Sequence, residues 1–534
     1  MIRRLAAEGQ GKGGKPPPKR RKPKPPPPPP PIPELQRPPV LLVIAVVLTA
    51  VLEVLDMTIV NVAIPHMLGA FGATPDQITW VLTSYIVAAA VIMPLTGYLS
   101  NWLGRRRLLL LSISGFVLTS VLCGMAWDLE SMVFFRLAQG VFGAPLVPLS
   151  QAILLDAFPR EKHGQALAIF GMGIMVAPVI GPALGGYLTE AYSWRMVFYI
   201  NIPLGMFALL ISAGYLPKRA IKDIRTDWLG MALLVIAVGA LQFVLDQGQM
   251  RDWFNSKAVI VGAIIAVFTT ASFFLRGWNK PDNIIDLSLL KDRNFVAGTI
   301  AITLYGISLL GWMALMPLFA QRLLGYPADV AGTLFIPRGI VSAITLAVTG
   351  GLLIRIFDAR WLVGGGIVLT AVGTLMMAHY NLNVDFWSIA NPSMVSGVGT
   401  GLFFVPLTAV AFASIASSKY DEASGVYNLM RGIGGSAGIA VVSWLFVRQT
   451  HIHFAELTAH VTPFNKELLP YLAERGLDPY SPQAAPAIAY EIGRQAQMLA
   501  FNDLFWFIGI ATLLITPVLF FMTRPKNVNL VPAH

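Results

Sequence analysis

Five ionisable residues fall inside otherwise apolar stretches, and their types could support proton transfer or ion pairing. They are Glu53, Asp56, Arg136, Arg338 and Arg431. Charged side chains are costly within a membrane and mark ion or proton pathways where they occur. A buried carboxyl group that gains and loses a proton beside an arginine that senses its charge could couple proton movement to a change of shape.

Glu53 and Asp56 are three residues apart and therefore share one helix face. Asp56 and Arg136 lie roughly 9 and 8 Å below the outer boundary of the bilayer, so we expect them to pair. Glu53 and Arg338 lie roughly 14 and 15 Å deep, a weaker match because it joins distant parts of the chain. The Asp56–Arg136 pair is either a fixed contact or a proton-coupling pair. We favour coupling through Asp56, with Glu53 as the alternative carrier and protonated at rest, because burial disfavours the carboxylate.

Apolar runs long enough to cross a membrane carry these charges. Hydrophobic residues form 55% of the 534-residue chain and charged residues 13%, whereas soluble domains hold about a quarter charged residues. Runs of about 20 apolar residues predict membrane helices at residues 41–62, 79–100, 108–127, 131–155, 164–190, 195–216, 227–246, 257–275, 295–318, 328–350, 361–380, 387–413, 424–447 and 500–522. The predicted fold class is an all-α membrane protein with fourteen transmembrane helices.

Lysine and arginine are concentrated in alternate segments between these spans, beginning with the N-terminal tail. Such residues favour the cytoplasmic side, so we expect both termini there. The net charge of +11 is spread over short blocks, which argues against a nucleic-acid-binding patch. The sequence contains no G-x-S-x-G, Walker A, H-E-x-x-H or CxxC motif. We therefore expect no catalytic residues, no metal and no cofactor.

Two segments lack the composition of a span. Residues 1–39 are basic and proline-rich, which predicts a disordered cytoplasmic tail that is either solvated or bound to anionic lipid headgroups. Residues 450–499 form a long polar segment that we expect to be a periplasmic loop, and loops of this length usually have a function. Its three histidines, His451, His453 and His460, lack the additional ligands that would complete a metal site.

The fifth span carries a stripe of small residues at every fourth position. The stripe and its neighbours are Gly173, Ala177, Pro178, Gly181, Pro182, Gly185 and Gly186. Small residues on one face let a second helix approach closely in lipid. The two prolines remove backbone donors, which requires a protein or water-lined environment. We favour a moving contact between helices of a transporter over a static packing face.

Several motifs carry a family resemblance. LDMTIVNVAIP lies at residues 55–65, GYLSNWLGRRR lies at 97–107, and Arg136 precedes Gln139 and Gly140. With residues 177–186, they resemble the major facilitator superfamily, and specifically its fourteen-span drug:proton antiporters of the EmrB type. The resemblance extends through PLVPLSQAILL, WRMVFYINIPLG, LDQGQMRDWF, DLSLLKDRNF and NDLFW, so it covers nearly everything after residue 40.

The resemblance implies a conformational role for Gly97, Gly104, Arg105 and Arg106. Asn101 stands where the superfamily usually has an acid. The resemblance therefore does not establish that this loop acts as a charge-relay gate. Glu53 stands where a neutral residue is expected, so the resemblance implies no role for it.

The resemblance also implies two six-helix bundles, at residues 40–216 and 295–523, with two inserted helices within 217–294 and a cytoplasmic tail at 524–534. It implies proton-driven export of hydrophobic or amphipathic compounds across the bacterial inner membrane. The partners implied are a periplasmic membrane-fusion adaptor and an outer-membrane channel. Two alternatives stay open: a secondary transporter of one defined solute, such as a metabolite or siderophore, and a non-transporting membrane scaffold.

Overall fold

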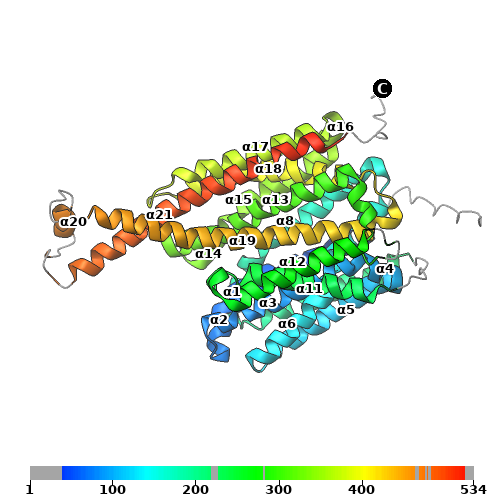
Figure 1. Ribbon diagram of the computed structural model, residues 1–534, viewed down its shortest axis with the longest axis horizontal. Coiled ribbons are helices and arrows are strands. Elements are labelled where there is room, and N and C mark those ends of the chain that lie inside the picture. Colours follow the sequence, from blue (N-terminus) through cyan, green and yellow to red (C-terminus); the bar gives the residue numbers. More distant parts are fainter. Residues whose placement is uncertain are drawn as a thin grey trace, which may run out of the picture. The chain divides into compact units, whose positions relative to one another are not determined.

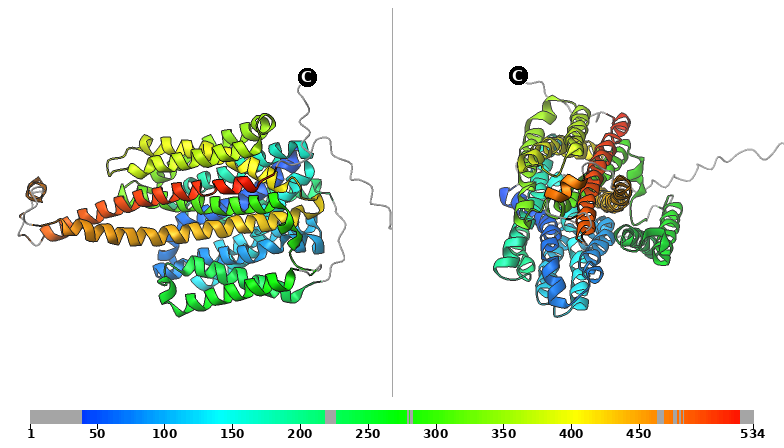
Figure 2. Two further views of the ribbon diagram at one scale, coloured as in Figure 1. Left: turned by 45° about the horizontal axis from the view of Figure 1, so that its top comes forward. Right: turned by 90° about the vertical axis from the view of Figure 1, so that its left-hand side faces the viewer.

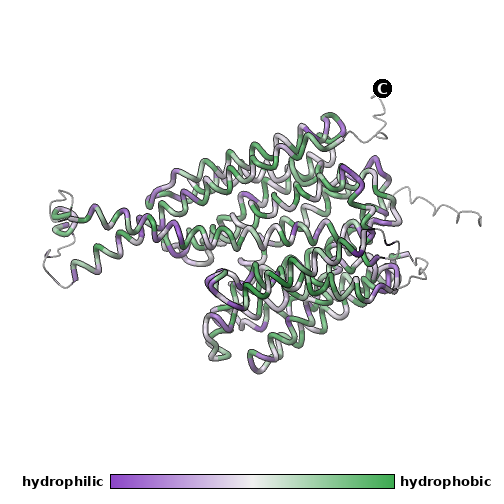
Figure 3. The backbone as a smooth tube through the Cα atoms, in the orientation of Figure 1, coloured by the Kyte–Doolittle hydropathy of each residue, from purple (hydrophilic) through white to green (hydrophobic). Residues whose placement is uncertain are grey.

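The computed structural model describes residues 39–217, 226–278, 280, 283–462, 468–474, 478, 481 and 483–523. Within these ranges the regular structure is helical and contains no β-strand. Among the described residues, fourteen helical stretches are long and apolar enough to cross a membrane, which confirms the predicted fold class. Apolar residues run along these helices, and hydrophilic residues gather towards their ends (Figure 3).

The spans fall into a first half, an inserted pair and a second half (Figure 1). The first half comprises α1 (Val40–Phe71), α2 (Pro75–Ile78), α3 (Trp80–Ile92), α4 (Thr96–Leu103), α5 (Arg105–Gly124), α6 (Leu129–Gly143), α7 (Leu146–Ala157), α8 (His163–Ala191), α9 (Met196–Tyr199) and α10 (Asn201–Tyr215). The inserted pair is α11 (Trp228–Gln247) and α12 (Lys257–Gly277). The second half comprises α13 (Arg293–Pro317), α14 (Ala328–Thr333), α15 (Phe335–Val348), α16 (Ile354–Ile356), α17 (Ala359–Met376), α18 (Phe386–Phe412), α19 (Tyr420–Ala459), α20 (Leu468–Glu474) and α21 (Ala484–Leu513).

Proline interrupts the fourth span within the bundle. Helix α6 ends at Gly143 and α7 begins at Leu146, with Pro145 between them and Pro148 in the first turn of α7. The first N–H groups of a helix have no partner within that helix. The break therefore places unsatisfied backbone donors inside the first half. Pro178 and Pro182, in contrast, lie within the continuous helix α8.

The two halves meet along two seams. In the α8–α15 seam, Val179 of α8 fills the space that a side chain on Gly339 of α15 would need. In the α4–α19 seam, a Cβ on Gly97 would collide with Glu422. The glycines thus allow close approach of helices from the two halves.

The segment between the last two spans is more helical than its polar composition suggests. Helix α19 continues to Ala459 and α21 begins at Ala484, so both extend into the predicted loop of residues 450–499. The two extensions run side by side beyond the neighbouring helices (Figure 2). The sequence after residue 447 contains no proline or glycine before Pro463, so nothing in it ends α19 at the bilayer boundary. We call this feature the α19–α21 hairpin.

The inserted pair is held together by an ion-pair cluster at the start of α11. Asp227 accepts a hydrogen bond from the backbone N–H of Gly230 at 3.2 Å and so caps the helix. Its two carboxylate oxygens also accept hydrogen bonds from Arg276 of α12 at 2.6 and 2.8 Å. Lys280 lies 3.0 Å from the same carboxylate. Arg276 and Lys280 therefore hold the pKa of Asp227 well below its usual range.

We predict that Asp227→Asn lowers the melting temperature of the purified protein by a few degrees at neutral pH. The pKa of Asp227 is lower in the folded protein than in the unfolded chain, where it is about 3.9. The ion pairs therefore stabilise the folded protein at pH values above about 3.9, and this stabilisation is lost as the pH falls from there towards the folded-state pKa. The deficit of the variant should therefore shrink under acidic conditions. Thermal unfolding followed across a pH series measures it.

The control is Asp252→Asn, which changes an exposed carboxylate in the turn at the other end of the pair. It should leave the melting temperature unchanged. A deficit of Asp227→Asn that stays constant across pH would contradict the ion-pair explanation.

Candidate functional site

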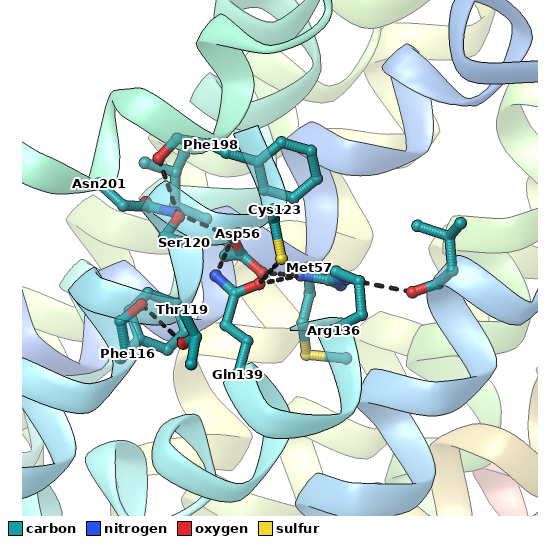
Figure 4. A network of polar contacts seen from close by, with 12 residues as sticks. Asp56, Met57, Phe116, Thr119, Ser120, Cys123, Arg136, Gln139, Phe198 and Asn201 are labelled. Carbon is teal, nitrogen blue, oxygen red and sulfur yellow. Dashed lines mark hydrogen bonds and ion pairs between the residues drawn. The ribbon is translucent and has the colours of Figure 1, made fainter. Parts of the chain in front are cut away.

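Asp56 lies at the centre of a buried polar network in the first half (Figure 4). Arg136 of α6 donates to its Oδ2 atom at 2.6 Å. Its Oδ1 atom accepts hydrogen bonds from Gln139 at 3.0 Å and from Asn201 of α10 at 2.8 Å. Both members of the predicted Asp56–Arg136 pair are almost fully buried, with exposures of 0% and 1%. Equal depth in the bilayer correctly indicated this contact.

The Arg136 guanidinium is also satisfied on its other sides. Its Nε atom donates to the carbonyl oxygen of Val81 at 3.1 Å, and Nη1 donates to Gln139 at 2.7 Å. The ring of Tyr85 lies beneath it, with the centroid 4.2 Å from Cζ. A buried ion pair is tolerated when hydrogen bonds satisfy both partners. This network is therefore a compensated unit that joins α1, α3, α6 and α10.

Glu53 lies one turn away from Asp56 on α1, in a different environment. Its Oε2 atom accepts a hydrogen bond from the backbone N–H of Val147 at 3.1 Å. Val147 is in the first turn of α7, so Glu53 caps the helix end that the proline break created. Helix α7 in turn contacts α19 of the second half, where Ser424 and Asn428 donate hydrogen bonds to Gln151 of α7 at 2.8 and 2.6 Å. The helix that Glu53 caps is thus bound to the second half.

Arg338 does not meet Glu53, although their predicted depths match. Its guanidinium lies over the ring of Trp312, with Cζ 3.9 Å from the ring centroid. The salt bridges among the described residues include none that joins Arg338 to Glu53. Depth alone cannot pair residues across the halves, because it carries no information on which helices are adjacent.

Arg105 ties the two halves together at the α4–α19 seam. It forms ion pairs with Asp156 of α7 at 2.8 Å and with Asp421 of α19 at 2.7 Å. Asn101, which stands where an acid was expected, donates to Glu422 at 3.0 Å. The acid of this contact thus comes from the second half. We call these contacts the Arg105 latch.

The other predicted residues of this loop support its geometry. Gly104 has a φ of +85°, a backbone conformation that favours glycine. Arg106 donates to the carbonyl oxygen of Ala213 on α10. Gly97 permits the close contact with Glu422 described above.

The small-residue stripe packs against α1 rather than against the second half. A Cβ on Gly181 would overlap Thr58, and one on Gly173 or Gly185 would crowd Val47 or Ile59. Other α8 residues, among them Gly171 and Val179, contact the second half. The stripe therefore fixes α8 to the helix that carries Glu53 and Asp56, and these helices form one close-packed unit beside the α8–α15 seam.

Residues 46–439 match the family model described as Major Facilitator Superfamily. The chain is 36% identical to the multidrug export protein EmrB of Escherichia coli K12 over 492 residues, covering 91% of this chain and 96% of that protein. The chain belongs to the Major Facilitator Superfamily.

Other relatives agree with this membership. The fatty acid resistance protein FarB of Neisseria gonorrhoeae is 35% identical, with 90% of this chain and 95% of that protein covered. The colistin resistance protein EmrB of Acinetobacter baumannii is 30% identical, with 89% and 94% covered. The crystal structure of the human organic anion transporter MFSD10 (TETRAN) superimposes with a TM-score of 0.60, covering 89% of this chain and 100% of that one. At 16% identity it supports the fold alone.

Sequence reasoning missed several residues of the Asp56 network and of the Arg105 latch. Asn201 and Ser120 extend the Asp56 network, with Asn201 donating to Ser120 at 3.0 Å. Asp421 and Glu422 lie just before the predicted start of span 13, where acids near a helix N-terminus have an ordinary electrostatic explanation. The break at Pro145 was the one available signal that Glu53 had a helix end to cap.

We predict that Gly181→Leu reduces transport while the protein still reaches the membrane. The leucine must displace Thr58 and separate α1 from α8, and overpacking of this kind costs about 1–3 kcal/mol. Transport in proteoliposomes, normalised to the amount of reconstituted protein, measures the effect.

Gly186→Leu is the matched control, because the nearest atom to its added Cβ would be Val62 Cγ1 at 3.9 Å. It should retain most of the activity. Full activity of Gly181→Leu would show that close contact between α1 and α8 is dispensable.

Proposed function

We propose that this protein exports hydrophobic or amphipathic compounds across the bacterial inner membrane in exchange for protons. The names of its relatives, which include multidrug export and resistance proteins, support the export of varied compounds. The observation that carries proton coupling is a buried carboxyl group, Glu53, which caps helix α7, and α7 is itself hydrogen-bonded to α19 of the second half. The concentration of positive charge supports an orientation with both termini in the cytoplasm.

Glu53, more than Asp56, has the contacts of a proton carrier. The Glu53 carboxylate is stabilised by the N-terminus of α7, and Gln151 of α7 accepts hydrogen bonds from α19 of the second half. A rearrangement of α19 that shifts α7 removes part of this stabilisation, so the protonated form gains. Each proton that crosses the membrane contributes about 2.3 kcal/mol per 100 mV. That free energy biases the alternation between the two arrangements.

Asp56 has a supporting role in this proposal, although its depth had made it the first choice. Three side chains donate to its carboxylate, and all three belong to the first half. Movement of the second half therefore leaves these contacts in place. The Asp56–Arg136 network then holds α1 at a fixed position, so that Glu53 stays at the end of α7.

Transport of a compound panel into proteoliposomes under an imposed proton gradient tests the function. Gradient-dependent uptake with mutual competition among unrelated compounds supports multidrug export. Uptake of one solute without such competition supports the single-solute alternative. Absence of any proton-linked flux would refute both.

We predict that Glu53→Gln abolishes proton release when substrate is added to purified protein in weak buffer. It should also abolish gradient-driven transport while substrate exchange continues, because the halves still alternate. Asp56→Asn should instead destabilise the protein, since an unpaired buried Arg136 costs about 3–5 kcal/mol. Unchanged proton release by Glu53→Gln, with loss in a folded Asp56→Asn protein, would make Asp56 the carrier.

The α19–α21 hairpin is the proposed contact for a periplasmic adaptor that leads to an outer-membrane channel. Its base is fixed by Asp503 of α21, which accepts hydrogen bonds from Gln449 and His453 of α19 at 2.7 Å each. Beyond that base it exposes apolar side chains, including Leu469 of α20 and Tyr490 of α21. An exposed apolar surface outside the bilayer is typical of a protein contact.

We predict that replacing residues 456–498 with a short Gly–Ser linker abolishes copurification of the adaptor. The contacts of Asp503 with Gln449 and His453 remain, so the spans should stay in place and proteoliposome transport should persist. Adaptor pull-down and transport are measured on the same preparations. Adaptor binding by the shortened protein would place the contact elsewhere.

A further inference from the structure

One buried arginine in the described spans lacks an acidic partner. Arg338 of α15 is 6% exposed, and its Nη1 atom has no hydrogen-bond partner. Arg105 and Arg136, the other buried arginines, both pair with carboxylates. No salt bridge among the described residues includes Arg338. Burying a guanidinium group without an acidic partner has a high free-energy cost, and such a group within a membrane span indicates a functional role.

An aromatic surface supports the Arg338 guanidinium on one side. The Trp312 ring lies 3.9 Å from Cζ, and Phe335 packs edge-on against Trp312 with their centroids 5.6 Å apart. Trp312 is itself 2% exposed. A cation–π contact offsets part of the cost of burying the charge, but it satisfies no N–H donor in the guanidinium plane. The arrangement leaves a planar donor group over an apolar aromatic surface.

Arg338 also lies beside the α8–α15 seam. The next residue, Gly339, is the one whose missing side chain makes room for Val179 of α8. On the other side, the backbone oxygen of Arg338 lies close to Gly397 of α18. Arg338 is therefore held between helices of the second half, one residue from the contact with the first half. Separation of α8 from α15 opens a path to it.

We propose that Arg338 binds the anionic group of amphipathic substrates, whose apolar part packs on Trp312 and Phe335. This inference rests on the proposed export function and adds a substrate class to it. A carboxylate or sulfonate accepts hydrogen bonds from the planar guanidinium in a paired geometry, which neither a neutral nor a cationic group can do. Bound substrate then supplies the negative charge that the protein itself does not place there.

Equilibrium binding tests this site without requiring transport. The full-length protein is placed in nanodiscs of phosphatidylcholine, and three dansyl-labelled alkyl probes of equal length are compared by fluorescence anisotropy. The probes end in a carboxylate, a primary amide or a quaternary ammonium group. We expect the wild type to bind the carboxylate at least about 30-fold more tightly than the amide, as for other buried charge pairs. Arg338→Gln should remove this preference, and Arg338→Lys should keep part of it.

Arg448→Gln is the matched control. Arg448 also lies over a tryptophan, with Cζ 5.2 Å from the ring centroid of Trp444, but on an exposed part of α19. This variant should keep the full preference for the carboxylate. If Arg338→Gln cannot be purified, Arg338→Lys decides the question, and an unchanged preference in that variant overturns the proposal.

Three other results would overturn the site. The wild type could bind the three probes equally, or Arg338→Gln could retain the preference. Displacement of the carboxylate probe by phosphatidylglycerol in the nanodiscs would instead make a lipid headgroup the occupant. A carboxylate preference that depends on Arg338, in a protein without proton-driven flux, would refute the proposed function but support the site. Proton-driven flux without the preference would refute the site alone.

Discussion

The free-energy cost of charge within a bilayer governs the arrangement of this protein. A charged side chain at the centre of a membrane helix costs about 2.5–3.5 kcal/mol even on the most lenient scales. Asp56 and Arg136 offset that cost with each other and with the amides of Gln139 and Asn201. These contacts draw α1, α6 and α10 together. The helix packing of the first half therefore depends on satisfying one buried ion pair.

Two buried charges of the first half lie close to where the halves meet. Arg105 lies between Asp156 of its own half and Asp421 of the other. Glu53 caps α7, and Gln151 of α7 accepts hydrogen bonds from Ser424 and Asn428 of α19 in the other half. Close packing at the two seams joins the halves, and electrostatic contacts join them as well. Electrostatic contacts lose strength gradually with distance and can be exchanged for others, so they can persist in part while the packed seams separate.

The sequence predicts the helices well because each membrane span is a contiguous run of apolar residues, which can be recognised without knowledge of the rest of the fold. It also predicts the Asp56–Arg136 pair, because adjacent spans of one bundle at equal depth have few other partners. The sequence does not predict that Asp421 of the second half pairs with Arg105, because Asp421 lies 316 residues further along the chain. The helical extension at residues 448–459 was missed for a different reason. Polar composition marks where a segment leaves the bilayer, but it does not end a helix that lacks glycine or proline.

Helix α11 has polar contacts with both halves, and these contacts bear on how molecules enter from the lipid. Its Asp246 accepts a hydrogen bond from Thr83 of α3, and its Gln242 donates to Ser436 of α19 at 2.7 Å. The inserted helix therefore bridges α3 of the first half and α19 of the second. A compound dissolved in the bilayer cannot pass between those two helices without displacing α11. Under the proposed export function, lateral entry from the bilayer would thereby be directed towards the α8–α15 seam, where helices of the two halves contact each other directly.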